Sequence, residues 1–321
     1  MTEDFGFKVP KNITKLSLSN FDVNQNTLNI LSEYLQTEES VISELVFDGI
    51  NLSNMNYLCC ITPNSKVNKL WLSRCQLKDK GIEDLITVLD ETNIKTQLNS
   101  LYLDRNGITC KGARQIAQIL RTNRTLQSLS LASNLIKDEG ILAIMNVLSK
   151  FDLDDYETEW KFKYEQRRKR LVEYLVCLNN YNSKNDGNVD KIMLVVNMYC
   201  IVLCTNMDTI SCIELEKEQR SVTINPTINS SIILTDEDNL KQKAEKLLIS
   251  PTHPYLTDQL LRSGSSFHCL GNFKIEYLNI SYNRCSSNVL SFIEQVLQYQ
   301  QNICLPEEGI KDLKIEKFIE R

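Results

Sequence analysis

Side chains that commonly carry catalysis or bind metals are sparse in this sequence. Its two histidines, His253 and His268, have no cysteine or glutamate beside them at the spacing of a zinc site. Cys200 and Cys204 are four residues apart, yet they lie in an apolar run, which favours a place in a core. We find no G-x-S-x-G motif and no glycine-rich phosphate-binding loop. The sequence therefore predicts no catalytic residue, no metal site and no cofactor, and a structural role for both histidines.

Composition argues against several classes of partner. The 321 residues carry a net charge of −5, so the whole chain has no electrostatic preference for nucleic acid or for an anionic membrane. The longest apolar stretch, residues 192–204, is shorter than the roughly 20 residues that a membrane-spanning helix needs. Eleven scattered cysteines without a C-x-x-C pair, together with a polar N-terminus, predict a cytoplasmic protein with reduced thiols.

One pattern, L-x-x-L-x-L-x-x-N-x-L, recurs along the chain. Residues 98–108 and 126–136 match it in full. Including looser copies, six repeats begin at Ile13, Ile42, Val67, Leu98, Leu126 and Ile275. Alternate leucines point to one side of a strand, and the asparagine amide can bind backbone groups where the chain leaves that strand. Phe21 and Ile50 stand at the asparagine place in the first two copies, as expected for atypical terminal repeats.

The first five copies begin 25 to 31 residues apart, which leaves room for a helix after each strand. Apolar residues at helical spacing predict helices over 81–89, 112–120 and 140–148. Strands are predicted at 15–19, 44–48, 69–73, 100–104 and 128–132, all parallel in one sheet. The expected fold is thus α/β, a leucine-rich-repeat solenoid or horseshoe with a parallel inner sheet and outer helices.

One large insertion interrupts the repeats after the fifth copy. Its first part, residues 156–178, lacks glycine and proline and predicts a helix. Runs of β-branched residues predict strands at 192–204 and 221–234, and a charged helix is expected at 236–248. A strand at 277–281 should resume the sheet beside 128–132. The predicted organisation is five repeats in 1–150, an insertion of undetermined fold in 151–273, and a final repeat with a tail in 274–321.

The repeats resemble the ribonuclease-inhibitor-like superfamily over residues 13–150 and 275–300. A narrower likeness lies in the order of the segments around the insertion, which are Val147-Leu148-Ser149, Phe151, Leu153, Glu157, Arg167-Arg168, His253-Pro254, Leu256, Gly271-Asn272, Leu278-Asn279-Ile280, Asn283-Arg284, Phe292-Ile293 and Tyr299-Gln300. This order looks like the leucine-rich repeat-containing protein 71 family. That resemblance implies a protein of cilia and flagella with no catalytic residues. Residues 189–234 have no counterpart in it, and Cys285 replaces an expected aliphatic residue.

The strands should turn a second set of side chains away from the core. Because side chains alternate along a strand, Trp71 and Tyr102 should lie on the concave side, in equivalent places of adjacent strands. The central column is predicted to be Ser17, Val46, Trp71, Tyr102, Ser130 and Asn279, with Lys69, Asp48 and Asp104 beside it. Large aromatic side chains on an exposed sheet are typical interface anchors, which predicts a protein-binding site. The alternative is that the insertion folds over the rings, so that they are internal packing.

A basic segment lies in the helix predicted at the start of the insertion. Residues 156–173 hold six lysines and arginines against four glutamates, and the densest part is Arg167, Arg168, Lys169 and Arg170. A solvated helix face is the usual role of such a segment. The alternative is docking on an acidic surface such as that of tubulin, an idea that depends on the family resemblance.

Together these features predict a non-enzymatic scaffold that binds a protein partner, without nucleic acid, a membrane span or a small-molecule substrate. The resemblance adds an assembly role in the axoneme of a cilium or flagellum. Two alternatives use the same concave surface. One is an activator of a small GTPase, although such arrays have more repeats. The other is a cytosolic protein inhibitor of a secreted enzyme, although such inhibitors are longer and more acidic.

Overall fold

The computed structural model describes residues 12–19, 22–89, 96–182, 253–257, 259–264 and 266–316. The chain divides into two compact units, residues 1–154 with 252–321, and residues 155–251. The described part of the second unit is one helix, α5 (Asp155–Asn182), which confirms the helix predicted at 156–178. The elements predicted at 192–204, 221–234 and 236–248 lie outside the described residues. The predicted boundaries at residues 150 and 273 stay predictions.

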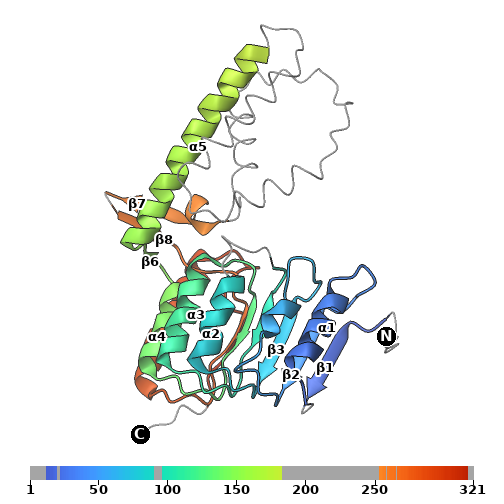
Figure 1. The fold of residues 1–321 in the computed structure, drawn as a ribbon. Coiled ribbons are helices and arrows are strands. Elements are labelled where there is room, and N and C mark those ends of the chain that lie inside the picture. The colour runs from blue at the N-terminus through green and yellow to red at the C-terminus, as the bar shows by residue number, and fades with distance from the viewer. Residues whose placement is uncertain are drawn as a thin grey trace. The chain divides into compact units, whose positions relative to one another are not determined.

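The first unit is built on a seven-stranded sheet in which all neighbours are parallel (Figure 1). In sheet order the strands are β1 (Lys15–Ser19), β2 (Glu44–Asp48), β3 (Lys69–Ser73), β4 (Ser100–Tyr102), β5 (Ser128–Ser130), β9 (Tyr277–Asn279) and β10 (Asp312–Lys314). The parallel pairing of the first five strands confirms the prediction. So does the pairing of β9 with β5 across the insertion. Sequence reasoning missed β10 although Ile310, Leu313 and Ile315 match the first three leucine places of the repeat template, because Phe318 stands at the asparagine place.

Helices follow most of the strands and form a second layer on one face of the sheet (Figure 1). They are α1 (Gln25–Leu35), α2 (Lys78–Leu89), α3 (Cys110–Thr122), α4 (Asp138–Val147) and α9 (Leu290–Ile303), the last preceded by a 3-10 turn, η3 (Ser287–Val289). Between β2 and β3 there is only a 3-10 turn, η1 (Tyr57–Cys60). This repeat is the shortest of the first four, with 25 residues from its start at Ile42 to the next start at Val67. The side chain of Asn51 also accepts a hydrogen bond from the Ser53 amide (3.1 Å), and such a local bond favours a turn over a helix.

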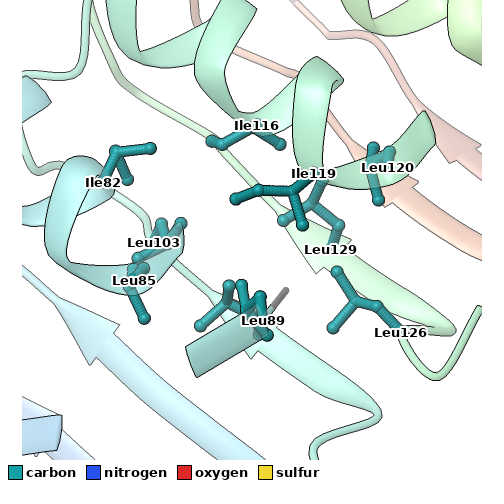
Figure 2. Close-up of a pocket in the computed structure, with 10 residues that line it drawn as sticks. Ile82, Leu85, Leu89, Leu103, Ile116, Ile119, Leu120, Leu126 and Leu129 are labelled. Carbon is teal, nitrogen blue, oxygen red and sulfur yellow. The ribbon is translucent and has the colours of Figure 1, made fainter. Parts of the chain in front are cut away.

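The core lies between the sheet and the helices. Strand leucines such as Leu70, Leu101 and Leu129 have no more than 2% of their surface exposed, whereas their neighbours along the strand face away. Figure 2 shows a small gap in this layer, lined by Ile82, Leu85, Leu89, Leu101, Leu103, Ile116, Ile119, Leu120, Leu126 and Leu129. Its lining is entirely aliphatic and offers no polar group that would orient a ligand, so we interpret the gap as imperfect packing.

A row of buried asparagines joins the ends of neighbouring strands. Nδ2 of Asn134 donates to the carbonyl oxygen of Leu103 in the preceding repeat (3.0 Å). Its Oδ1 accepts from the amides of Asn106 (2.9 Å) and Ile108 (3.1 Å). Asn106 and Asn283 make equivalent bonds one repeat before and one repeat after. The predicted role of this asparagine, to satisfy backbone groups where the chain leaves the strand, is therefore confirmed.

Cys75 takes the asparagine place in the third repeat. Its Sγ lies 3.4 Å from the carbonyl oxygen of Phe47 and 3.3 Å from that of Ser73. A thiol is a weaker donor than an amide, so this link between repeats is weaker than the ones beside it. Burial raises the pKa of the Cys75 thiol to about 12. The thiols of Cys59, Cys60, Cys75, Cys110, Cys269, Cys285 and Cys304 are free.

A second row of buried amides binds carbonyl groups at the ends of the helices. Asn123 donates to the carbonyl oxygen of Leu89, the last residue of α2 (3.0 Å). Asn272 donates in the same way to the last turn of α3 (2.9 Å), and Gln300 to the end of α4 (2.7 Å). Asn272 falls inside the predicted insertion, yet it already takes part in the framework of the repeats.

The chain leaves and re-enters the first unit through a small antiparallel sheet. Its order is β6 (Phe151–Asp152), β8 (Ser266–Cys269) and β7 (Leu260–Ser263), and a 3-10 turn, η2 (Pro254–Leu256), precedes β7. Gly271 follows with φ +123°, and a Cβ atom there would lie only 2.8 Å from the carbonyl oxygen of Ser149. The returning chain can lie this close because glycine has no side chain.

Replacing Asn134 with alanine should lower the free energy of unfolding, because it leaves buried backbone groups of two repeats without partners. We expect a loss of about 1–3 kcal/mol for each such group. Urea denaturation measures the change. Asn288→Ala is the matched control, because Asn288 is exposed and should change stability by less than about 0.5 kcal/mol. Equal stability of the two variants would contradict the role given to the asparagine row.

Candidate protein-interaction surface

The strand register collects one set of side chains on the face of the sheet opposite the helices, which we call the strand face. Across the sheet it aligns Ser17, Val46, Trp71, Tyr102, Ser130 and Asn279, the order predicted from the sequence. Lys314 of β10 continues the row. Lys69 and Asp48 lie in the flanking rows, because each is two residues from a member of the central row on its own strand. Asp104 lies in the turn after β4 and contacts Ser130 of the central row.

Trp71 and Tyr102 form a stacked pair on the strand face. Their ring centroids are 3.5 Å apart and the ring planes differ by 8°. Both side chains are half-buried, because each ring covers one face of the other. The sequence predicted adjacent places for the rings but not this contact. The indole N–H of Trp71 has no hydrogen-bond partner among the described residues.

Sequence reasoning missed Tyr277, which extends the aromatic pair. Its ring centroid lies 6.4 Å from that of Tyr102, with the planes tilted by 49°. The signal was present, since Tyr277 directly precedes the first strand leucine of the last repeat and so belongs to a row flanking the central one. Lysines lie over the two outer rings, with Nζ of Lys15 5.7 Å from the Trp71 centroid and Nζ of Lys314 5.4 Å from the Tyr277 centroid.

Three carboxylates on β2 and after β4 lie in different electrostatic environments. Glu44 binds Lys15 (2.6 Å). Asp48 is held by Nε and Nη2 of Arg74 (2.8 and 2.5 Å), which keeps the pKa of its carboxyl group below the usual value. Asp104 instead accepts hydrogen bonds on Oδ1 from the Ser130 hydroxyl (2.5 Å) and the Ala132 amide (3.0 Å), and burial raises its pKa.

Left-handed backbone turns place the residues that follow the strands. Arg74, Arg105, Ser133 and Tyr282 occupy equivalent positions in successive repeats, each one residue before the asparagine place, and all have φ between 57° and 59°. This conformation is costly for residues other than glycine, so the surrounding hydrogen bonds must hold it. The turn after β3 brings Arg74 back to Asp48 of the neighbouring strand.

Comparison with known proteins points to the same repeats. A family model described as "Leucine Rich repeat" matches residues 122–145. The ribonuclease inhibitor of Mus musculus is 32% identical over 136 residues, which are 41% of this chain and 29% of that protein. RAN GTPase-activating protein 2 of Arabidopsis thaliana is 30% identical over 93 residues, 28% of this chain and 16% of that protein. NACHT, LRR and PYD domains-containing protein 5 of Bos taurus is 28% identical over 139 residues, 43% of this chain and 12% of that protein.

These matches support a leucine-rich-repeat protein of the ribonuclease-inhibitor-like superfamily. The chain spans well under two thirds of the length of each of these relatives. The segment matched by the family model runs from the end of α3 through β5 into α4, so it is one leucine-rich repeat with its strand and most of its helix.

The remaining predicted site residues lie in the second unit or serve the framework. In α5, Lys161 pairs with Glu165 (2.9 Å) and Lys163 with Glu159 (2.7 Å), one helical turn apart. Lys169 and Arg170 are exposed and Arg168 is half-buried, while the Arg167 side chain lies outside the described residues.

Both histidines have structural contacts, as predicted. The buried His253 accepts a hydrogen bond on Nδ1 from the Tyr255 amide (3.3 Å), and His268 pairs with the Asp152 carboxylate across β6 and β8. In the described ranges, no group of three or more histidine, cysteine, aspartate and glutamate side chains could hold a metal ion. None of the described helices is long and apolar enough to span a membrane.

The stacked pair should contribute a measurable coupling energy. A double-mutant cycle with Trp71→Leu and Tyr102→Leu should give a coupling of about 0.5–1.5 kcal/mol in the free energy of unfolding, the range for aromatic pairs. Trp71→Leu with Tyr34→Leu is the control cycle, since Tyr34 lies in α1 in the other layer, and its coupling should be near zero. A coupling near zero in both cycles would show that the stack does not persist in solution.

Proposed function

We propose that these leucine-rich repeats are a non-enzymatic scaffold that binds another protein on the strand face. The observation that carries this proposal is the stacked pair of Trp71 and Tyr102, on a face where the fold needs no aromatic side chain. Tryptophan and tyrosine are enriched among the few interface residues that contribute most of the binding energy. Two relatives support the same class of function, since the names ribonuclease inhibitor and RAN GTPase-activating protein describe action on another protein.

We also propose that the sheet curves into a horseshoe with the strand face on its concave side. Neighbouring parallel strands are about 4.8 Å apart, whereas packed helices are about 8–10 Å apart. Successive repeats therefore occupy more space in the helix layer than in the strand layer, which bends the array toward the strands. A concave strand face would surround a partner and increase the number of contacts around the aromatic pair.

The resemblance to the leucine-rich repeat-containing protein 71 family leads us to propose an assembly role in the axoneme of a cilium or flagellum. In this proposal Arg168, Lys169 and Arg170 of α5 dock on an acidic surface such as that of tubulin. Proximity labelling with the tagged protein, in ciliated and in non-ciliated cells, tests it. We expect axonemal proteins among the labelled products of ciliated cells. Their absence would refute the ciliary role and leave the scaffold proposal standing.

Activation of a small GTPase is a second candidate, favoured by the similarity to RAN GTPase-activating protein 2. It is tested by GTP hydrolysis on Ran, with and without a stoichiometric amount of the full chain. We expect no acceleration, because these repeats match only 16% of that relative's length. An accelerated rate would replace the scaffold proposal with a catalytic-regulator role. Inhibition of a secreted ribonuclease, suggested by the other relatives, is tested in the same way with the nuclease in place of Ran.

The double variant Trp71→Ala, Tyr102→Ala should lose partner binding while the array stays folded. We expect a loss of about 2–4 kcal/mol in binding, the scale of dominant interface residues, because both anchors are removed together. Proximity labelling compares the wild type, the double variant and Tyr34→Ala, an aromatic control in the helix layer. Partners labelled by wild type and Tyr34→Ala should be missing with the double variant. If they persist while the double variant melts far below the wild type, the rings are internal packing and the strand face is not the site.

A further inference from the structure

We propose that the partner presents an arginine side chain to Tyr102 and Asp104. This inference rests on the proposed function, and it specifies the chemistry that the strand face recognises. Tyr102 ends β4 and Asp104 lies in the turn that follows it. The Ser130 hydroxyl donates to Oδ1 of Asp104, and Ser130 is the partner of Tyr102 across the sheet, so the carboxylate lies on the strand face near Tyr102. One group must therefore satisfy an aromatic ring and a carboxylate together.

The carboxylate of Asp104 differs from its neighbours in having no ion-pair partner. Glu44 is neutralised by Lys15 and Asp48 by Arg74, at 2.6 and 2.5 Å. In the part of the chain that the structure describes, Asp104 makes no salt bridge, and its donors are a hydroxyl and a backbone amide that both bind Oδ1. Oδ2 keeps its acceptor capacity, because both donors bind Oδ1. Oδ2 is also not one of the fully buried atoms without a partner, so a group from outside can reach it. A cation from outside would complete this site.

Among the three aromatic rings, the middle one also lacks a cation. The outer rings, Trp71 and Tyr277, each have a lysine ammonium within 6 Å of the ring centroid. Tyr102 lies between them, and no described cation lies over its ring. Burial is the main cause that raises the pKa of the Tyr102 hydroxyl group, followed by Tyr277, Glu44 and Asp104, and the nearby charge of Arg105 acts on Asp104 without a salt bridge between them. The middle of the strand face is therefore the place where an added cation is best stabilised.

Arginine fits this site better than lysine. Its guanidinium group is planar, so it can lie against the Tyr102 ring while an N–H at its edge donates to Oδ2 of Asp104. It is also more weakly hydrated than an ammonium ion, which lowers the cost of removing it from water beside a half-buried ring. Ser130 and the Ala132 amide hold Asp104 in place, so little side-chain freedom is lost when the cation binds.

The experiment uses Trp71 as the reporter. The chain has two tryptophans, Trp71 and Trp160, so a full-length Trp160→Phe variant leaves tryptophan fluorescence only from Trp71, beside the proposed site. This variant is titrated with a short neutral peptide that carries one arginine, and with two peptides that have lysine or citrulline in its place. Citrulline keeps the planar shape and loses the charge. We expect a saturable change in Trp71 emission with the arginine peptide, and binding about tenfold weaker with citrulline.

Asp104→Asn in the same background should weaken arginine-peptide binding to the citrulline level. The matched control is Asp312→Asn, which removes an exposed carboxylate in β10 at the edge of the same face and should leave binding unchanged. Circular dichroism and melting temperature establish that each variant is folded. Equal binding of the three peptides, no response up to their solubility limit, or an Asp104→Asn variant that binds as tightly as its parent would each overturn the arginine proposal.

Failure of this inference can be told apart from failure of the proposed function. If the arginine peptide does not bind but the double variant of Trp71 and Tyr102 loses its partners, the strand face is the interface and the partner uses other chemistry. If the double variant keeps every partner, the strand face is not the interface and both proposals fall.

Discussion

The backbone groups at the end of each strand set the constraint on which this fold depends. Each strand of the seven-stranded sheet stops after three to five residues and the chain turns away, so N–H and C=O groups there lose their partners in the sheet. A buried group of this kind costs about 1–3 kcal/mol when it is left unpaired. Asn106, Asn134 and Asn283 satisfy these groups, and each binds two repeats at once. The bonds form only when neighbouring repeats are in register, so the asparagine row helps to fix the register of the whole strand face.

The same constraint explains how the array tolerates a large insertion. Asn283 binds the carbonyl group of Leu131, and Asn272 binds that of Leu120, each across 152 residues of chain. The entropy cost of closing a loop grows slowly, by about 0.6 kcal/mol for each doubling of its length. Asn283 accepts a hydrogen bond from one backbone amide of the preceding repeat where Asn134 accepts two, and it donates to the equivalent carbonyl group, so most of the link between repeats is kept and the cost of interruption is modest. Gly271 completes the junction by allowing the returning backbone to lie against Ser149.

Much of this fold could be predicted because the repeat pattern specifies both the strand and the side of the sheet. The leucines predicted the alternation, and the spacing of the copies predicted which residues meet across the sheet, including Trp71 and Tyr102. The stacking of these two rings could not be predicted, because it depends on side-chain torsions that the pattern does not constrain. The turn η1 was hidden because its helix-breaking polar residues have no fixed place in the template, and β10 because it lacks the asparagine. Tyr277 was visible in the sequence but was not placed beside Tyr102, because the two residues lie in different rows.

Within each strand, the positions that pack in the core differ from those on the strand face. The strand face can therefore carry aromatic side chains that are positioned before a partner binds. The second and fourth strand positions fill the core and the asparagine row fixes the register, so the fold makes no demand on the positions between them. An isolated tryptophan there would expose its ring to water and would lose side-chain freedom when a partner binds. Stacking against Tyr102 reduces both costs, because the rings shield each other and their torsions are already restricted. Ordering a side chain at an interface costs about 0.5–1.5 kcal/mol, which a pre-stacked pair largely avoids. Asp104 is held by hydrogen bonds in the same way. The strand face therefore combines a rigid aromatic surface with a fixed carboxylate, and both are positioned by a framework that does not depend on them.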